Sequence, residues 1–433
     1  MRDLVVFFVQ FCMLWMVWWF ATNHDRKDFV FFVFGLIFAT SICYFFGSLW
    51  MVRLRHLIIP LAFMAIALRW RLLKGNMGSL GKIYLLLTIC VFVASFWSSD
   101  PNGFLELKWR RTVNNICLIL MAATFRTGDD LRKVLYMAMP QILLLAFGLH
   151  FGAQDFGTTG EERLSVNEVN SNVVGSMAAF VVFGSLLSIL YTKTPKAFKA
   201  LFGVCLIVGL RALISSGSRT AFASCMCASL LAIAVVLTSV RRFWLVGVPM
   251  LSFCGIVLSH VWRNSSYSAV DRLAALATGG VSGRDKVWEM GYHYLVDNKL
   301  WFGAGGLVRG FFVDRLDFDR TRLYWGSMLN IYFDTIYETG VLGLTLWVAF
   351  LLFFFWLSFR IWRSGSSKLR YVPIAMVSWG LLQGVGESMP LTAFEPVGNF
   401  FVVGLVVISA RRFQYESPTS ESRFCVASGA RPW

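Results

Sequence analysis

The chain has 433 residues, of which 57% are hydrophobic and only 15% are charged. So few charges cannot cover a soluble protein of this length, and so many apolar residues exclude a disordered chain or a coiled coil. The formal net charge of +16 is therefore attributed to cytoplasmic lysines and arginines that set the topology of an all-α polytopic membrane protein, and not to nucleic-acid binding.

Apolar runs near the roughly 20 residues that a bilayer crossing requires follow one another along the chain, about 12 in all. They cover residues 4–22, 29–50, 80–98, 108–125, 133–152, 170–191, 199–215, 219–240, 243–261, 327–358, 371–388 and 396–410. A shorter run, 57–68, has basic residues and no acid on both flanks. We expect it to lie on the cytoplasmic side without crossing, which places both termini inside; a crossing there would move the N-terminus outside.

The predicted spans form one helical membrane domain, residues 1–410, followed by a polar, serine-rich tail, 411–433, expected to be cytoplasmic and disordered. One connection is much longer than the others. Residues 262–326 lie between the ninth and tenth spans and are expected to form a large periplasmic loop with short helices. A loop of this length is usually functional.

A helix is predicted inside this loop, starting at Ser282. Ser282 and Asp285 have the spacing of a capping box, and Val287, Met290 and Leu295 form a partial apolar stripe. A cluster of glycines follows it, at Gly303, Gly305 and Gly306.

Three outer stretches each place one arginine on or near the outer membrane face. The first holds Arg163 and is followed by Asn167, Asn170 and Asn172; the second is Ser215–Thr220 with Ser218 and Arg219; the third is Ser282–Asp285 with Arg284. A guanidinium group keeps its charge and binds a diphosphate through two parallel hydrogen bonds. These arginines are thus candidates for holding a diphosphate leaving group. The alternatives are a surface charge for Arg163 and an ordinary first-turn helix residue for Arg284.

Arg219 is the most informative of the three. It separates two apolar runs, and the Ser-Ser-Gly-Ser sequence before it predicts a helix break. An arginine at this depth is costly unless it is paired or hydrated, which favours a functional site over an arginine that snorkels to the interface. Arg211, in the preceding run, is a further candidate for glycan or diphosphate binding, or for a structural ion pair.

The tenth span carries two carboxylates on one helical face. Asp334 and Glu338 are four residues apart, and Asn330 precedes them by four more, so the three extend one polar stripe. Either carboxylate could orient an acceptor hydroxyl or serve as general base. The alternative is a structural ion pair with an arginine such as Arg211.

The sequence favours chemistry without a metal or a cofactor. The five histidines are scattered without ligand spacing, and no phosphate-binding loop or dinucleotide fingerprint is present. Work driven by ATP is therefore not expected of this chain.

Taken in order, these motifs resemble the bacterial O-antigen polymerase and ligase superfamily over roughly residues 80–410. The motifs that carry the resemblance are Phe96–Pro101, Arg163 to Asn172, Ser218-Arg219-Thr220-Ala221, Ser282-Gly283-Arg284 with Trp288, the glycine-rich stretch, and Asn330 with Glu338-Thr339-Gly340 and Gly343. The resemblance implies a bacterial inner-membrane enzyme with a periplasmic active site. Such an enzyme moves a glycan from an undecaprenyl diphosphate carrier to an acceptor sugar without a metal, its arginines holding the diphosphate. Arg219 and Arg284 match motif positions, and Arg163 matches less closely.

The sequence departs from the family at one position. Family members, the ligases especially, carry His-Asn where this chain has Leu329-Asn330, so the base proposed for the ligases is missing there. His293 could replace it only if the large loop folds back over the site. The departure favours a polymerase, for instance of an exopolysaccharide such as xanthan, with a flippase and a chain-length regulator as expected partners.

Three alternatives stay open. A ligase would move the glycan onto lipid A-core or a protein. A transporter or flippase for a lipid-linked sugar would place its charges near the bilayer midplane, often in inverted repeats; here the arginines cluster on one face. A non-catalytic assembly subunit would have no evident use for the break at Arg219.

Overall fold

The computed structural model describes residues 79–94, 96, 128–151, 154–156, 163–165, 171–236, 284–297, 301–304, 330–364 and 372–386, with scattered residues between positions 15 and 64. The predicted spans 108–125, 243–261 and 396–410 lie outside the described residues. So do the tail 411–433 and most of 57–68. The span count of about 12 and the division into domains stay predictions.

The described helices agree within a few residues with seven of the predicted spans and with the helix in the large loop. They are α4 (Ser79–Ala94), α6 (Gly128–Phe151), α7 (Ser171–Tyr191), α8 (Lys196–Ser215), α9 (Arg219–Val236), α13 (Arg284–Asp297), α15 (Ile331–Ser364) and α16 (Val372–Gly386). Among the described residues, three helical stretches are long and apolar enough to cross a membrane: Asn172–Tyr191, Lys196–Ser215 and Tyr332–Ile361. The prediction of a helical membrane protein is thus confirmed.

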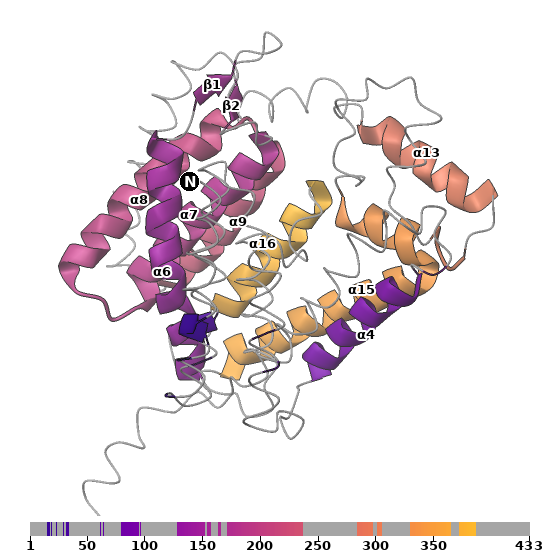
Figure 1. Ribbon diagram of the computed structural model, residues 1–433, viewed down its shortest axis with the longest axis horizontal. Coiled ribbons are helices and arrows are strands. Elements are labelled where there is room, and N and C mark those ends of the chain that lie inside the picture. Colours follow the sequence, from indigo (N-terminus) through magenta and orange to yellow (C-terminus); the bar gives the residue numbers. More distant parts are fainter. Residues whose placement is uncertain are drawn as a thin grey trace, which may run out of the picture.

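One short antiparallel pair of strands interrupts the all-α pattern. β1 (Gln154–Phe156) pairs with β2 (Arg163–Ser165), and Phe156 lies opposite Arg163. The stretch with Arg163, expected as a connection before a helix, is therefore a strand. β2 contacts α7 and α8 at one end of the helices (Figure 1).

α7 is the central helix of the larger group, because α6, α8 and α9 all pack against it. Its side chains from Val173 to Ser188 are all buried. Trp379 of α16 closes the same core: its ring lies 6.4 Å from that of Phe180 and 5.2 Å from that of Phe183. Ring pairs at these distances add to the stabilisation that burial alone provides.

α16 lies between two parts of the molecule. On one side it packs against α9, and on the other side against α15 (Figure 1). α15 in turn contacts α4 and α13. α16 is therefore the element through which the α6–α9 group and the α13–α15 group are held together.

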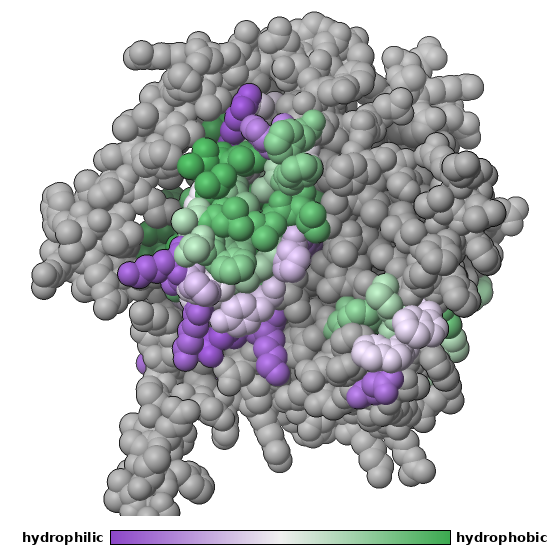
Figure 2. Space-filling model, turned by 60° about the vertical axis from the view of Figure 1, so that its left-hand side comes forward, coloured by the Kyte–Doolittle hydropathy of each residue, from purple (hydrophilic) through white to green (hydrophobic). Residues whose placement is uncertain are grey.

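The outer surface of α6 and α8 carries an apolar band with polar groups at both ends (Figure 2). On α8 the exposed apolar side chains recur every three residues, at Phe198, Leu201, Val204 and Ile207. Lys193 and Lys196 precede this stripe, Lys199 lies at its start, and the exposed Arg211 follows it. By helix rise, Lys196 and Arg211 are about 22 Å apart, as expected for a stripe that faces lipid.

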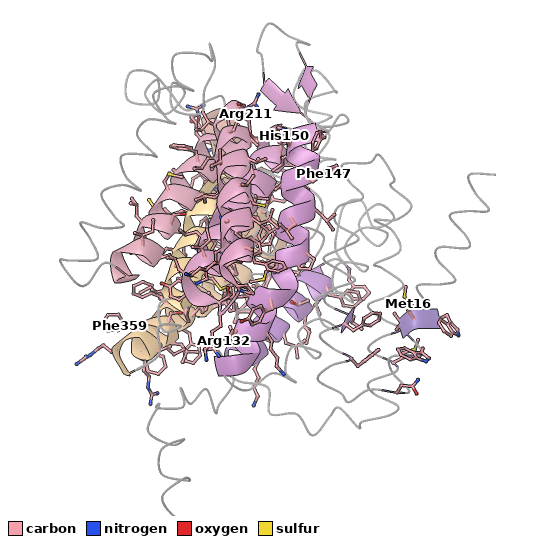
Figure 3. All side chains as sticks on the ribbon, turned by 90° about the vertical axis from the view of Figure 1, so that its left-hand side faces the viewer. Met16, Arg132, Phe147, His150, Arg211 and Phe359 are labelled. Atoms are coloured by element: carbon pink, nitrogen blue, oxygen red, sulfur yellow. The ribbon has the colours of Figure 1, made fainter. Side chains whose placement is uncertain are left out.

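The two ends of the helices differ in their charged residues. Arg132 lies at one end, while His150 and Arg211 lie at the other (Figure 3). The lysines at the start of α8 belong to the Arg132 end, because α8 runs from them toward Arg211. We call the opposite end, where α7 and α9 begin, the Arg211 end.

Candidate functional site

The turn between α8 and α9 lies at the Arg211 end and confirms the predicted helix break. α8 ends at Ser215, α9 begins at Arg219, and Gly217 has a φ of 64°. The Ser216 amide donates to the Ala212 carbonyl at 2.9 Å, and the Ser218 amide donates to Ser216 Oγ at 3.2 Å. The turn thus satisfies its own backbone groups, and it leaves Arg219 half-buried at the first position of α9.

The first turns of α7 lie directly against this turn. A β-carbon added at Gly175 would come within 2.5 Å of Ser218 Cβ and 2.8 Å of Ser216 Oγ. Only a glycine therefore allows this approach. The side chain of Ser218 is buried here, while Asn172, one turn earlier on α7, is half-buried. The structure thus brings together three predicted residues, Asn172, Ser218 and Arg219.

For three other predicted residues, Arg163, Arg284 and Asn170, the structure does not describe the side chain. Arg163 lies in β2 and Arg284 is the first residue of α13, but their side chains and all of Asn170 are outside the described residues. Arg211 is exposed at the end of the α8 stripe (Figure 3). Their roles remain predictions.

The carboxylate region differs from its prediction, because α15 is broken and not a continuous span. Gly340 has φ 68° and ψ −158°, which ends one helical segment and starts another. Glu338 lies two residues before this break. Glu338 and Asp334 are both half-buried, one turn apart on the first segment.

The break is held by a short segment of the large loop, Trp301–Ala304. The Val341 amide donates to the Trp301 carbonyl at 2.9 Å, and the Ala304 amide donates to the Tyr337 carbonyl at 2.7 Å. Gly303 has a φ of 79°, and a β-carbon there would lie 2.6 Å from the Glu338 carbonyl carbon. We call this arrangement, Trp301–Ala304 against Tyr337–Val341, the glycine clamp. It fixes the backbone of Glu338 from a sequence distance that no local pattern reveals.

Asn330 caps α15 and does not lie within the span as expected. Its Oδ1 accepts hydrogen bonds from the Tyr332 amide at 2.9 Å and the Phe333 amide at 3.2 Å. The helix begins at Ile331, so Asn330 precedes the polar stripe of Asp334 and Glu338. The side-chain oxygen of Asn330 is therefore occupied in capping the start of α15.

The described part of the large loop packs against this region. α13 lies against the first segment of α15 through two stacked ring pairs. Trp288 and Phe333 are 5.3 Å apart, and Tyr294 and Tyr337 are 6.1 Å apart. α13 begins at Arg284, two residues after the predicted Ser282, and its Leu295 is buried as the apolar stripe predicted. His293 is exposed on this helix.

The end of α16 joins the two regions through hydrogen bonds. Tyr332 Oη donates to the Leu381 carbonyl at 3.2 Å, which connects α16 to the start of α15. Two residues further on, Gln383 Nε2 donates to Ser176 Oγ at 2.8 Å and Gln383 Oε1 accepts from Ser224 Oγ at 2.6 Å. Sequence analysis missed Gln383; the only signal was an amide within the apolar run 371–388.

The candidate residues form a cationic side, Arg219 at the start of α9, and an acidic side, Asp334 and Glu338 on the first segment of α15. Both α9 and α15 pack against α16. Such a pair can stabilise a departing anion at one point and accept a proton at another. Within the ranges that the structure describes, no three His, Cys, Asp or Glu side chains are grouped as a metal site.

The sequence was compared with models of known protein families. Residues 204–348 fit a family model described as O-antigen ligase. The matched segment covers Arg219, Arg284, Asp334 and Glu338, and it ends beyond the break in α15. No curated protein matches the sequence.

Proposed function

Because residues 204–348 match a family model described as O-antigen ligase, we propose that the chain belongs to the O-antigen polymerase and ligase superfamily and is a glycan polymerase of the bacterial inner membrane. It transfers undecaprenyl-diphosphate-linked oligosaccharide repeat units, on the periplasmic side, into a surface or extracellular polysaccharide. The match to the O-antigen ligase model supports the general class, an enzyme that transfers lipid-linked glycans. The donor lipid, the orientation and the metal-independent chemistry belong to the proposal.

The proposed reaction joins two lipid-linked substrates. A hydroxyl of the acceptor sugar attacks the anomeric carbon of the donor chain, and the bond from that carbon to the diphosphate oxygen breaks. Glu338 or Asp334 takes the hydroxyl proton, and the arginines Arg219, Arg284 and Arg163 bind the diphosphate that leaves. Diphosphate is already a good leaving group, so the acceptor hydroxyl does not need a strong base, and the arginines stabilise the charge that develops on the diphosphate.

The observation that carries this proposal is the pairing of two helix breaks across α16. The break before Arg219 supplies a half-buried guanidinium, and the break after Glu338 fixes the backbone of a carboxylate. Hydrogen bonds from α16 connect the helices that carry them. A transfer between two substrates needs one group that holds the donor and another that holds the acceptor.

A ligase is the second candidate, since the matching family is itself described as O-antigen ligase. The absence of the family histidine at Leu329 favours the polymerase. A transporter is less well supported: Arg211 and Arg219 lie near one end of the described helices, not near their middle.

The test is Arg219→Lys in cells that lack the native gene, with lipid-linked glycans resolved by length. Lysine keeps the charge but loses the two-pronged hydrogen bonding. We expect single repeat units to accumulate and long chains to fall by at least about 100-fold. Arg363→Lys, an exposed arginine in the last turn of α15, is the matched control and should give normal chains.

The other outcomes separate the alternatives. Full-length polymer left unattached would indicate a ligase. Repeat units trapped on the cytoplasmic face would indicate a flippase. Chains of wild-type length in Arg219→Lys would remove Arg219 from the mechanism.

A further inference from the structure

Gln383 lies in the most connected buried polar group of the described residues. Its side chain is 1% exposed, and both ends of the amide are hydrogen-bonded to other helices. The Ser224 hydroxyl of α9 donates to Gln383, Gln383 donates to the Ser176 hydroxyl of α7, and Ser176 donates to the Asn172 carbonyl at 3.0 Å. The four groups form a directed chain, and each bond in such a chain strengthens the next.

This chain of hydrogen bonds ends on the two helices next to the turn that carries Arg219, at Ser224 of α9 and Asn172 of α7. Ser224 lies five residues after Arg219 on α9, about 7.5 Å along the helix axis, and Asn172 lies one turn before Gly175, which packs against Ser218. The neighbouring Leu381 carbonyl accepts the hydroxyl of Tyr332, which lies two residues before Asp334. One turn of α16 therefore touches the helix of Arg219, the helix of Asn172 and the helix of the two carboxylates.

A buried amide inside an apolar helix is costly, and packing alone does not require it. Trp379, on the same helix, already fills the core with apolar contacts to Phe180 and Phe183. Polar side chains kept inside membrane helices are usually functional. Gln383 also lies outside residues 204–348, so nothing in the family match assigns it a role.

We propose that Gln383 is a positioning residue that sets the separation between Arg219 on α9 and the carboxylates on α15. This inference rests on the proposed function. The donor binds at Arg219 and the acceptor binds at the carboxylates, and each can bind without the other. Transfer, however, requires that the two binding groups be held at one fixed separation. A displacement of about 1 Å can cost about 100-fold in rate, while binding to each side persists.

The test compares Gln383→Leu with Gln141→Leu in the full chain, reconstituted in lipid nanodiscs. Gln141, on α6, is equally buried at 1% exposure, and its amide has no hydrogen-bond partner among the described residues. In Gln383→Leu both serines keep an alternative, because Ser176 still donates to Asn172 and Ser224 lies 3.1 Å from the Ala221 carbonyl. Neither variant leaves a new buried group unpaired, so both should fold.

The substrate in this assay is the lipid-linked repeat unit extracted from cells that lack the native gene. For Gln383→Leu we expect kcat to fall about 10-fold to 100-fold, with KM within about twofold of the wild type. Gln141→Leu should keep both values. Ser176→Ala combined with Gln383→Leu should be no slower than Gln383→Leu alone, because both cut the same chain of hydrogen bonds.

A distance measurement keeps this inference separate from the proposed function. Spin labels on the exposed Cys227 of α9 and at Leu342 of α15, with the other cysteines replaced, report the separation of the two helices. We expect Gln383→Leu to shift or broaden this distance and Gln141→Leu to leave it unchanged. A wild-type protein that moves no glycan would overturn the proposed function, and the label distance would then decide the role of Gln383. If Gln383→Leu matches Gln141→Leu in both kcat and distance, the inference is wrong.

Discussion

The two helix breaks of the candidate site place residues of opposite charge, Arg219 and Glu338, by different means. The turn at Gly217 joins two helices adjacent in sequence, and hydrogen bonds from Ser216 and Ser218 close it locally. The break at Gly340 lies inside one helix and depends on Trp301–Ala304, more than thirty residues earlier in the chain. A local turn can tolerate a change by adjusting its own loop. In the glycine clamp, backbone packs directly against backbone from a distant segment. We therefore expect substitutions there to lower stability and activity more than substitutions in the local turn.

The largest effect is expected for Gly340→Ala. The new β-carbon would lie 2.0 Å from the Trp301 carbonyl oxygen, and the residue would keep a φ of 68° that favours glycine. Because neither backbone can yield cheaply, we expect glycan transfer to be lost and thermal stability to fall clearly.

Gly203→Ala is the matched control for this change, because a β-carbon at Gly203 of α8 meets nothing within 4 Å. Alanine at a helical position should leave stability unchanged or raise it by up to about 1 kcal/mol. Gly217→Ala should fall between the two, at about 1–2 kcal/mol, because an alanine there would keep a φ of 64°. A Gly340→Ala protein as stable as Gly217→Ala would contradict the difference between the two breaks.

The second prediction concerns the residue that the clamp fixes. Glu338→Gln keeps the size of the side chain but removes the carboxylate that would take the proton. We expect transfer to fall about 100-fold, and Asp334→Asn, which lies one turn from the clamp, to have a smaller effect. The measurement is chain length in cells, with Glu289→Gln, an exposed position on α13, as control. A larger loss in Asp334→Asn would assign the proton to Asp334 instead.

The third prediction tests the approach of α7 to the local turn. Gly175→Ala brings a β-carbon within 2.5 Å of Ser218 Cβ, so either the turn or α7 must move. We expect a loss of about 1–3 kcal/mol in stability and a partial loss of transfer. Adding Ser218→Gly removes the nearer opposing atom and should restore part of the melting temperature, because Ser216 Oγ would still lie 2.8 Å from the new β-carbon. Failure of this rescue would mean that the contact between the two helices is not the cause.

The smallest effect is expected at the cap of α15. Asn330→Ala should lower stability by about 1 kcal/mol, whereas Asn330→Asp should retain it, because aspartate caps a helix as well as asparagine does. Thermal unfolding measures the first effect. If Asn330→Asp folds normally but loses transfer, Asn330 contributes to substrate binding beyond its capping role.

Local sequence patterns predicted most of the described helices. Spacing and apolar length located α7, α8, α9 and α16 within a few residues, since each long apolar run has one stable form in a membrane. The Ser-Ser-Gly-Ser sequence likewise predicted the break before Arg219, because a turn that satisfies its own hydrogen bonds is encoded in the residues that form it.

Other features depend on contacts that a single stretch of sequence does not contain. Asp334 and Glu338 were predicted on one helical face, and they do lie one turn apart, but the break after Glu338 was not predicted. Gly340 alone is compatible with a continuous helix; the backbone of Trp301 and Ala304 makes the break stable. The strand that contains Arg163 was missed for the same reason, because its partner is β1.

The sequence by itself determined a helical membrane protein whose arginines and carboxylates resemble those of the O-antigen polymerase and ligase superfamily. Composition, apolar run length and short motifs carry that information, since each acts through the residues nearest to it. Only the tertiary structure decided that the large loop clamps α15 at Gly340 and that Gln383 of α16 joins α7 and α9 while Leu381 joins α15. Those arrangements arise where backbone and polar groups from distant segments satisfy one another, and their partners are fixed only when the helices pack.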